Sequence, residues 1–90
     1  MNKDLITGKS VIDTEIKSLV LMKKEMSGSF DRAIKLLYQT KGKIVVSGIG
    51  KSGHIASKIS STLSSIGSPS FYLHPSEANH GDLGMITKGD

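Results

Sequence analysis

Hydrophobic and polar positions along the chain predict a first helix over residues 3–26. Apolar residues recur every seven positions, and one more fills the turn between them on the same side: Leu5, Ile12, Ile16, Leu19 and Met26. This spacing puts them on one face of a helix, and most of the intervening lysines face away.

A second helix is predicted after the break at Ser27–Ser29, with Ser29 as its N-cap. The apolar residues that follow form one face of this helix: Phe30, Ala33, Ile34 and Leu37. We expect Gly42 to end it in the left-handed conformation.

The pattern then changes to strand, helix and strand. Residues 43–47 contain a continuous apolar run that is typical of a parallel strand covered on both faces. A glycine-rich turn over residues 48–53 leads into a helix over 52–66, which Gly67 closes, and a second strand follows over 69–73. Residues 74–90 are expected to be an irregular loop.

This order predicts an α/β fold with a Rossmann-like parallel sheet between helices, because strand–helix–strand implies a parallel crossover. Two strands are too few for an independent sheet, so we expect a truncated fold. We divide the chain into a helical segment, residues 1–42, and the first part of an α/β domain, residues 43–90.

Composition narrows the classes of function. The chain has no cysteine, which excludes disulfides, thiolate zinc sites and cysteine nucleophiles. No apolar run is long enough to cross a membrane and no signal core precedes the first helix, so we expect a cytoplasmic protein without a membrane partner. The net charge of +4 is spread over the helices among acids, with only four aromatic residues in the chain, so we expect no nucleic-acid partner.

The glycine-rich turn is a candidate anion site. Unpaired amides at a helix start attract phosphate, and Lys51 and Ser52 can add charge and a hydrogen bond. A Walker loop is excluded because Val45 stands where glycine is needed. Three alternatives stay open: a dinucleotide site through Gly48, Gly50 and Gly53, a sugar-phosphate site, and a turn that only connects strand to helix.

Residues 74–84 form the second informative segment, which we call the histidine loop. It follows the carboxyl end of a strand, where ligands gather in open α/β sheets. His74, His80 and the carboxylates of Glu77 and Asp82 are candidates for acid–base chemistry near neutral pH. His74, Glu77 and His80 could also bind a metal, and each histidine could equally be a loop hydrogen-bonder or helix cap. We expect His54 to be structural or to lie at the edge of the site.

Together, the segment from Val45 to Ile55 and the segments Ser68–Pro75 and His80–Met85 resemble the sugar isomerase (SIS) fold, and more closely the arabinose 5-phosphate isomerase family. The resemblance implies a SIS domain that begins near residue 43 and an aldose–ketose isomerase that interconverts D-ribulose 5-phosphate and D-arabinose 5-phosphate. In bacteria this family feeds the synthesis of the lipopolysaccharide sugar Kdo.

The same resemblance implies roles for individual residues. Lys51 and His80 match catalytic positions, and His80 also contacts substrate. His74 matches a position implicated in the binding of inhibitory zinc. The remaining implied substrate-binding residues are Ser47, Gly48, Gly50, Ser52, Gly67 and Ser68.

The resemblance further implies a sugar-phosphate substrate, a homotetramer and no cofactor. The family has a second, serine-rich phosphate loop beyond the part matched here, so we expect these ninety residues to be inactive alone. The alternative is a non-catalytic SIS module that binds a sugar phosphate.

Overall fold

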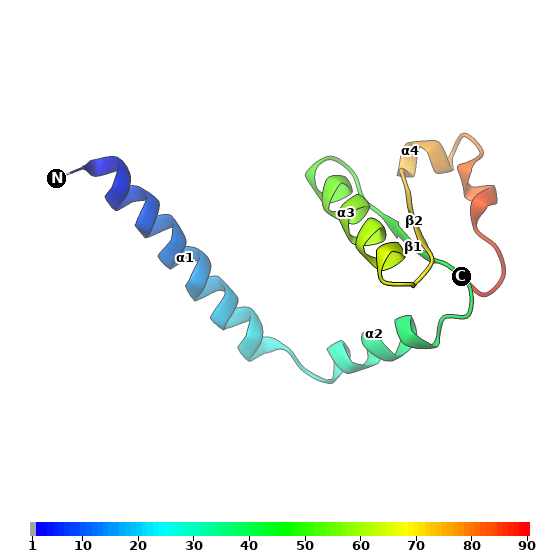
Figure 1. Ribbon diagram of the computed structural model, residues 1–90, viewed down its shortest axis with the longest axis horizontal. Helices are drawn as coiled ribbons and strands as arrows, with labels where there is room; N and C mark the ends of the chain where they lie inside the picture. The colour runs from blue at the N-terminus through cyan, green and yellow to red at the C-terminus, as the bar shows by residue number, and fades with distance from the viewer. Residues whose placement is uncertain (1) are drawn as a thin grey trace. The chain divides into compact units, whose positions relative to one another are not determined.

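The computed structural model describes residues 2–90 and falls into two compact units, one ending at Ile34 and the other spanning Lys35–Asp90. The helices and strands follow in the order α1 (Lys3–Glu25), α2 (Gly28–Gln39), β1 (Ile44–Ser47), α3 (Lys51–Ser65), β2 (Ser70–Leu73), α4 (Pro75–Ala78) and the short 3₁₀ helix η1 (Asp82–Met85) (Figure 1). Within residues 2–90, no helix combines the length and the apolar character that a bilayer span requires.

Helix α1 confirms the first predicted helix. The Asn2 side-chain oxygen accepts hydrogen bonds from the backbone N–H groups of Asp4 and Leu5, at 2.9 and 3.4 Å. Asp4 in the first turn and Lys23 and Lys24 in the last have the charges that the helix dipole favours. None of its residues is buried.

Two expectations for α2 are wrong. The helix begins at Gly28, so Ser29 lies inside it rather than at its N-cap; the Phe30 N–H already donates to Ser27 O at 3.0 Å. The helix also ends at Gln39, and Gly42 does not adopt a positive φ. Gly42 instead needs its small size, because a Cβ there would overlap the Asp90 carboxylate and the Gly89 backbone.

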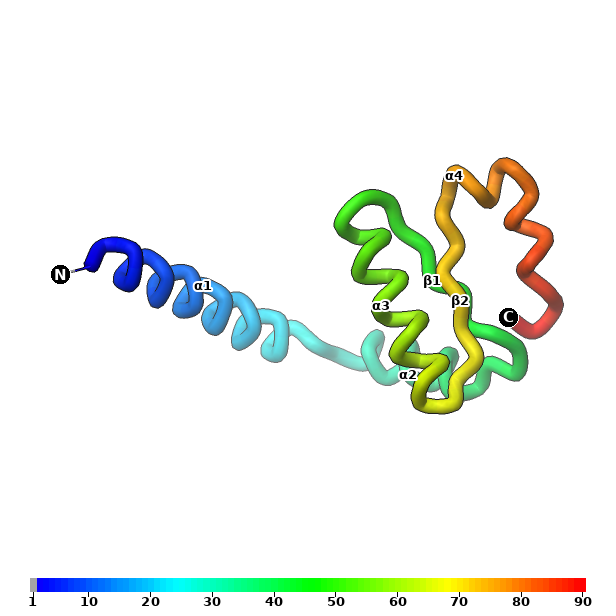
Figure 2. The backbone as a smooth tube through the Cα atoms, turned by 45° about the horizontal axis from the view of Figure 1, so that its top comes forward, coloured from blue at the N-terminus to red at the C-terminus, as the bar shows by residue number. Residues whose placement is uncertain are grey.

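Strands β1 and β2 form the predicted parallel pair, with Ile44 opposite Ser70 and Ser47 opposite Leu73. Helix α3 crosses between them and packs against both (Figure 2). Its buried positions Gly53, Ala56 and Ser60 are all small, which lets the helix approach the sheet closely. Gly67 confirms the predicted helix end: its φ of 93° is a conformation that only glycine adopts cheaply.

The core of the second unit is thin. Among the described residues, Ala56 and Leu73 are the two buried hydrophobic side chains, and Ile44, Val45 and Val46 are half-buried. The expected cover on both faces of β1 is therefore incomplete in this segment. The α/β class and the parallel crossover are confirmed.

Residues 74–90 are more regular than the expected loop. The His74 side chain caps α4 by accepting a hydrogen bond from the Ser76 N–H at 3.1 Å, and Pro75 has the fixed φ that suits a first helical position. Helix η1 follows, and the chain returns to the amino end of β1, where the Gly42 N–H donates to Gly89 O at 3.0 Å. The segment thus runs from the carboxyl end of β2 back to the start of β1 (Figure 1).

Candidate functional site

The candidate site begins where β1 passes into α3. Gly50 has φ 63° and ψ −131°, a combination that an L side chain would strain, and it stands at the N-cap of α3 without a side-chain hydrogen bond. The first helical bonds run from the Gly53 N–H to Ile49 O at 3.3 Å and from the His54 N–H to Gly50 O at 3.1 Å. The amides at the very start of α3 therefore face outward, with the positive end of the helix dipole.

The turn is closely packed. A Cβ on Gly48 would lie 3.0 Å from the backbone of Ser52 and Gly53, and a Cβ on Gly53 would lie 2.7 Å from Gly48 O. Both positions therefore need glycine for space, in addition to any contact with a ligand.

Ser47 ends β1, and its hydroxyl is already engaged. The Oγ–H donates to Leu73 O at 2.5 Å, at the neighbouring end of β2. Ser47 is exposed nevertheless, so its oxygen can still accept a hydrogen bond from a ligand hydroxyl.

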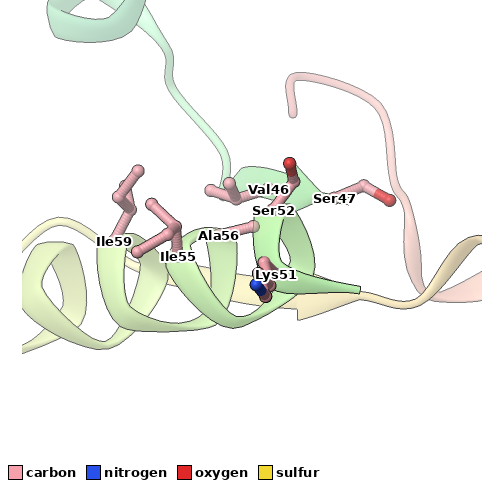
Figure 3. Close-up of a pocket in the computed structure, with 7 residues that line it drawn as sticks. All are labelled: Val46, Ser47, Lys51, Ser52, Ile55, Ala56 and Ile59. Atoms are coloured by element: carbon pink, nitrogen blue, oxygen red, sulfur yellow. The ribbon is translucent and has the colours of Figure 1, made fainter. Parts of the chain in front are cut away.

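Lys51 is the first residue of α3 and lies in an open pocket of about 400 Å³. Figure 3 shows the pocket: Ser47, Lys51 and Ser52 lie at the turn end, and Ile55 and Ile59 lie further along α3. Within residues 2–90 the one ion pair joins Lys43 to Asp90, so the Lys51 ammonium has no carboxylate partner among these residues. Lys51 is also exposed. The turn end of the pocket thus combines a cation, two hydroxyl groups and a helix start, a combination that favours an anion.

A second hollow of about 330 Å³ lies beside the turn, lined in part by His54, Tyr72 and His74. His54 therefore lies at the edge of the site, as expected. The rings of Tyr72 and His74 meet edge to face with centroids 6.3 Å apart.

The prediction that His74, Glu77 and His80 could together bind a metal ion is wrong. Among residues 2–90 no group of three or more histidines and carboxylates is close enough to hold a metal ion. The Nδ1 atom of His74 is occupied by the cap of α4, and that helix separates His74 from His80. His74 therefore has only Nε2 available to coordinate a zinc ion. That His74 binds an inhibitory zinc stays a prediction.

His80 lies between α4 and η1, is exposed, and belongs to neither of the two pockets. Its backbone N–H donates to Glu77 O at 3.0 Å. Because Ser47 and Leu73 are paired, the glycine turn and the histidine loop leave the same end of the sheet. The structure therefore brings the segments of Lys51 and His80 to one end, while their side chains do not share a pocket.

Gly67 and Ser68 lie at the other end. They follow α3, whose fifteen residues separate them from Lys51 by about 22 Å at the helical rise of 1.5 Å per residue. They line a different hollow with Lys41 and Pro69. In one copy of the chain, a single pentose phosphate cannot touch both Lys51 and this pair.

Two residues that support the site were missed from the sequence. The Tyr72 hydroxyl donates to Gly48 O at 2.6 Å, a tie that strand periodicity alone does not reveal. The Asp90 carboxylate accepts hydrogen bonds from the backbone N–H groups of Lys43 and Thr87, at 2.8 and 2.9 Å. Its side chain is 2% exposed and also pairs with Lys43 Nζ at 3.5 Å. The bonds from Thr87 and then Lys43 hold the pKa of Asp90 below its ordinary value.

Comparison with known protein families finds that residues 36–90 match the SIS domain. The chain is 49% identical over 89 residues to an uncharacterized protein of Rickettsia prowazekii, covering 99% of this chain and 28% of that protein. It is 47% identical over 83 residues to the arabinose 5-phosphate isomerase KdsD of Yersinia pestis, covering 92% and 25%. With KpsF of Escherichia coli O6:H1, also named an arabinose 5-phosphate isomerase, identity is 54% over 70 residues, covering 78% and 21%.

Two solved structures are similar to the chain. An Escherichia coli CFT073 protein in complex with arabinose 5-phosphate matches all of it with a TM-score of 0.89 and 43% identity, over 49% of that protein's chain. A phosphosugar isomerase, described as putative, from Bacteroides fragilis matches 88% of the chain with a TM-score of 0.69 and 37% identity, over 46% of its own chain. The chain thus spans about a quarter of the length of the curated relatives and about half of the two solved chains.

Proposed function

Since the chain belongs to the SIS domain family, we propose that it is the amino-terminal part of an aldose–ketose isomerase interconverting D-ribulose 5-phosphate and D-arabinose 5-phosphate. The observation that carries the proposal is the pocket at the glycine turn, where Lys51 presents an ammonium group with no carboxylate partner among residues 2–90. The relatives named arabinose 5-phosphate isomerase support the choice of substrate.

The reaction moves a proton between C1 and C2 through an enediol. It needs a base, an acid at the carbonyl oxygen, and a positive group near the oxygen on which negative charge develops. In our proposal Lys51 stabilises this oxygen or the substrate phosphate, and the outward amides at the start of α3 add positive potential. Ser52 donates a hydrogen bond to the same region, and Ser47 accepts one from a sugar hydroxyl.

His80 transfers or holds a proton in this proposal, since imidazole exchanges protons near neutral pH. Its loop leaves the sheet at the same end as the turn, and its side chain is exposed. The resemblance implies that the remaining acid–base and phosphate-binding groups lie beyond the part of the family matched here. The reaction as proposed uses no cofactor.

The proposal extends to a homotetramer and to the supply of arabinose 5-phosphate for Kdo and lipopolysaccharide. These points rest on the family resemblance. The cytoplasmic location likewise stays a prediction.

The test is an isomerase assay on the full-length protein that carries this segment, with Lys51→Ala and a matched Lys58→Ala variant. Lys58 lies on the same helix and is exposed. We expect turnover of arabinose 5-phosphate by the unaltered protein, a loss of about 100-fold or more for Lys51→Ala, and no loss for Lys58→Ala. Binding of the sugar phosphate without turnover by the unaltered protein would overturn the isomerase and leave a binding module.

A further inference from the structure

Two hydroxyl groups join the carboxyl ends of β1 and β2 in opposite directions. Ser47 at the end of β1 donates to Leu73 O of β2, and Tyr72 of β2 donates to Gly48 O just after β1. The second bond reaches past the strand into the glycine turn and joins the turn directly to β2.

The position of the Tyr72 hydroxyl depends on glycine at position 53. A Cβ on Gly53 would lie 2.8 Å from the Tyr72 oxygen and 2.7 Å from Gly48 O. The bare Cα of Gly53 therefore leaves the space in which the hydroxyl meets the carbonyl. Tyr72 is half-buried there, which shields the bond from water.

Gly48 O lies between the end of β1 and the start of α3, so a bond to it restrains both. The first backbone bonds of α3 form at Gly53 and His54, directly beside the hydroxyl. Lys51 is the first residue of that helix and has no side-chain cap beneath it, because the N-cap is Gly50. The placement of Lys51 thus depends on how firmly the turn is held.

We propose that Tyr72 is a positioning residue, whose hydroxyl fixes the glycine turn and, through it, the place of Lys51. The hold on the turn stands on the hydrogen bond itself. Its consequence for turnover rests on the function proposed above.

The first experiment measures amide hydrogen exchange in the full-length protein with Tyr72→Phe, which removes the hydroxyl and keeps the ring. We expect the Gly53 and His54 amides to exchange about threefold to tenfold faster, the range expected for loss of one hydrogen bond. The Ile66 and Ser68 amides at the far end of α3 should stay unchanged. Tyr38→Phe is the matched control, because Tyr38 is 91% exposed and its hydroxyl donates no hydrogen bond to any of residues 2–90. Unchanged exchange at Gly53 and His54 would overturn the proposal.

The second experiment measures isomerase turnover in a double-mutant cycle with Lys51. We expect Tyr72→Phe to lower kcat about threefold to tenfold when Lys51 is present, and less than twofold in the residual activity of Lys51→Ala, followed over long incubations. An equal loss in both backgrounds would show that Tyr72 does not act through Lys51 and would overturn the positioning role. Full turnover by Lys51→Ala would instead overturn the role proposed for Lys51, and the absence of turnover by the unaltered protein would overturn the proposed function. In both cases the exchange experiment still decides whether Tyr72 holds the turn.

Discussion

The glycine turn and the histidine loop leave the same end of the sheet, yet they are held in different ways. The turn is held by its own close packing, since Gly48 and Gly53 meet backbone to backbone, and by Tyr72 of β2, which donates to Gly48 O. The loop has two short helices that contact each other, and the His74 cap is a bond within the loop itself. The tie to β1 comes only after the loop, through Asp90.

Substitutions in the two segments should therefore differ in their effect on the free energy of unfolding. A substitution in the turn meets backbone that cannot move without displacing the start of α3, so it costs folding free energy. A substitution in the loop meets mostly solvent, so it leaves the sheet folded.

Gly53→Ala should have the largest effect on stability. The added Cβ would lie within 2.8 Å of both Gly48 O and the Tyr72 hydroxyl, so the turn must open. We expect a loss of about 3 kcal/mol in the free energy of unfolding, measured by urea denaturation of the full-length protein.

Gly8→Ala in α1 is the matched control. Among the described residues, nothing beyond the adjacent helix backbone would lie within 4 Å of the added Cβ. We expect it to be neutral or to stabilise by up to about 1 kcal/mol through helix propensity. Equal losses for the two variants would contradict the close packing of the turn.

Asp90→Asn should release the segment that follows the histidine loop from the start of β1, while the strands stay paired. The amide oxygen of the new Asn side chain can still accept a hydrogen bond from one backbone N–H. Its NH₂ group, however, would face the other backbone donor or the Lys43 ammonium. We expect faster amide exchange from residue 80 to residue 87, with unchanged exchange at Val45 and Phe71 in the sheet. Lys43→Met, which keeps the Lys43 backbone N–H, should have a smaller effect. If Lys43→Met matched Asp90→Asn, the ion pair rather than the backbone bonds would hold this segment.

The same anchor should depend on pH. The Thr87 and Lys43 backbone bonds lower the pKa of Asp90 from its ordinary 3.8. A carboxyl with a lowered folded pKa adds stability that is present above the ordinary value and is lost as pH falls through the lowered one. We therefore expect the Thr87 amide chemical shift to stay constant from pH 7 to 5 and to change only below pH 3.8, and this change should be absent in Asp90→Asn. A transition near neutral pH would contradict the role of Asp90.

His80→Ala should have the smallest effect on stability, since its side chain is exposed and belongs to neither pocket beside the turn. We expect less than about 0.5 kcal/mol in the free energy of unfolding. Turnover should nevertheless fall at least about 100-fold if His80 transfers a proton. Asn79→Ala, its neighbour in the loop, should change neither quantity. A large loss of stability in His80→Ala would remove the contrast between turn and loop.

The parts of the fold that follow from local pattern were predictable. The seven-residue repeat of α1, the apolar run of β1 and the closing role of Gly67 each depend on neighbours in sequence, and each was confirmed. The errors at Ser29 and Gly42 have a common cause: each residue type fits two roles, and the choice depends on contacts that the sequence does not display. Position 42 requires glycine because the Asp90 side chain, 48 positions later in the sequence, lies where a Cβ would be.

In the candidate site, too, features formed by consecutive residues were predictable and those that join distant segments were not. The glycine turn was recognisable because its residues are consecutive, and Lys51 follows from it. The ties of Tyr72 and Asp90 join distant segments, and the separation of Gly67 and Ser68 from Lys51 by the length of α3 appears only in three dimensions. The histidine spacing suggested a metal set, but among residues 2–90 no three such side chains lie close enough together to hold a metal ion.

A sugar phosphate bound at the glycine turn should be seen directly when the full-length protein is titrated with arabinose 5-phosphate and its backbone amides are followed by NMR. We expect the largest, saturable shifts at the amides from Gly48 to His54, where the turn and the start of α3 face the pocket. We expect smaller shifts in the histidine loop, and the loss of all of them in Lys51→Ala. Saturable binding that leaves the turn amides unmoved would show that this end of the sheet does not receive the sugar phosphate.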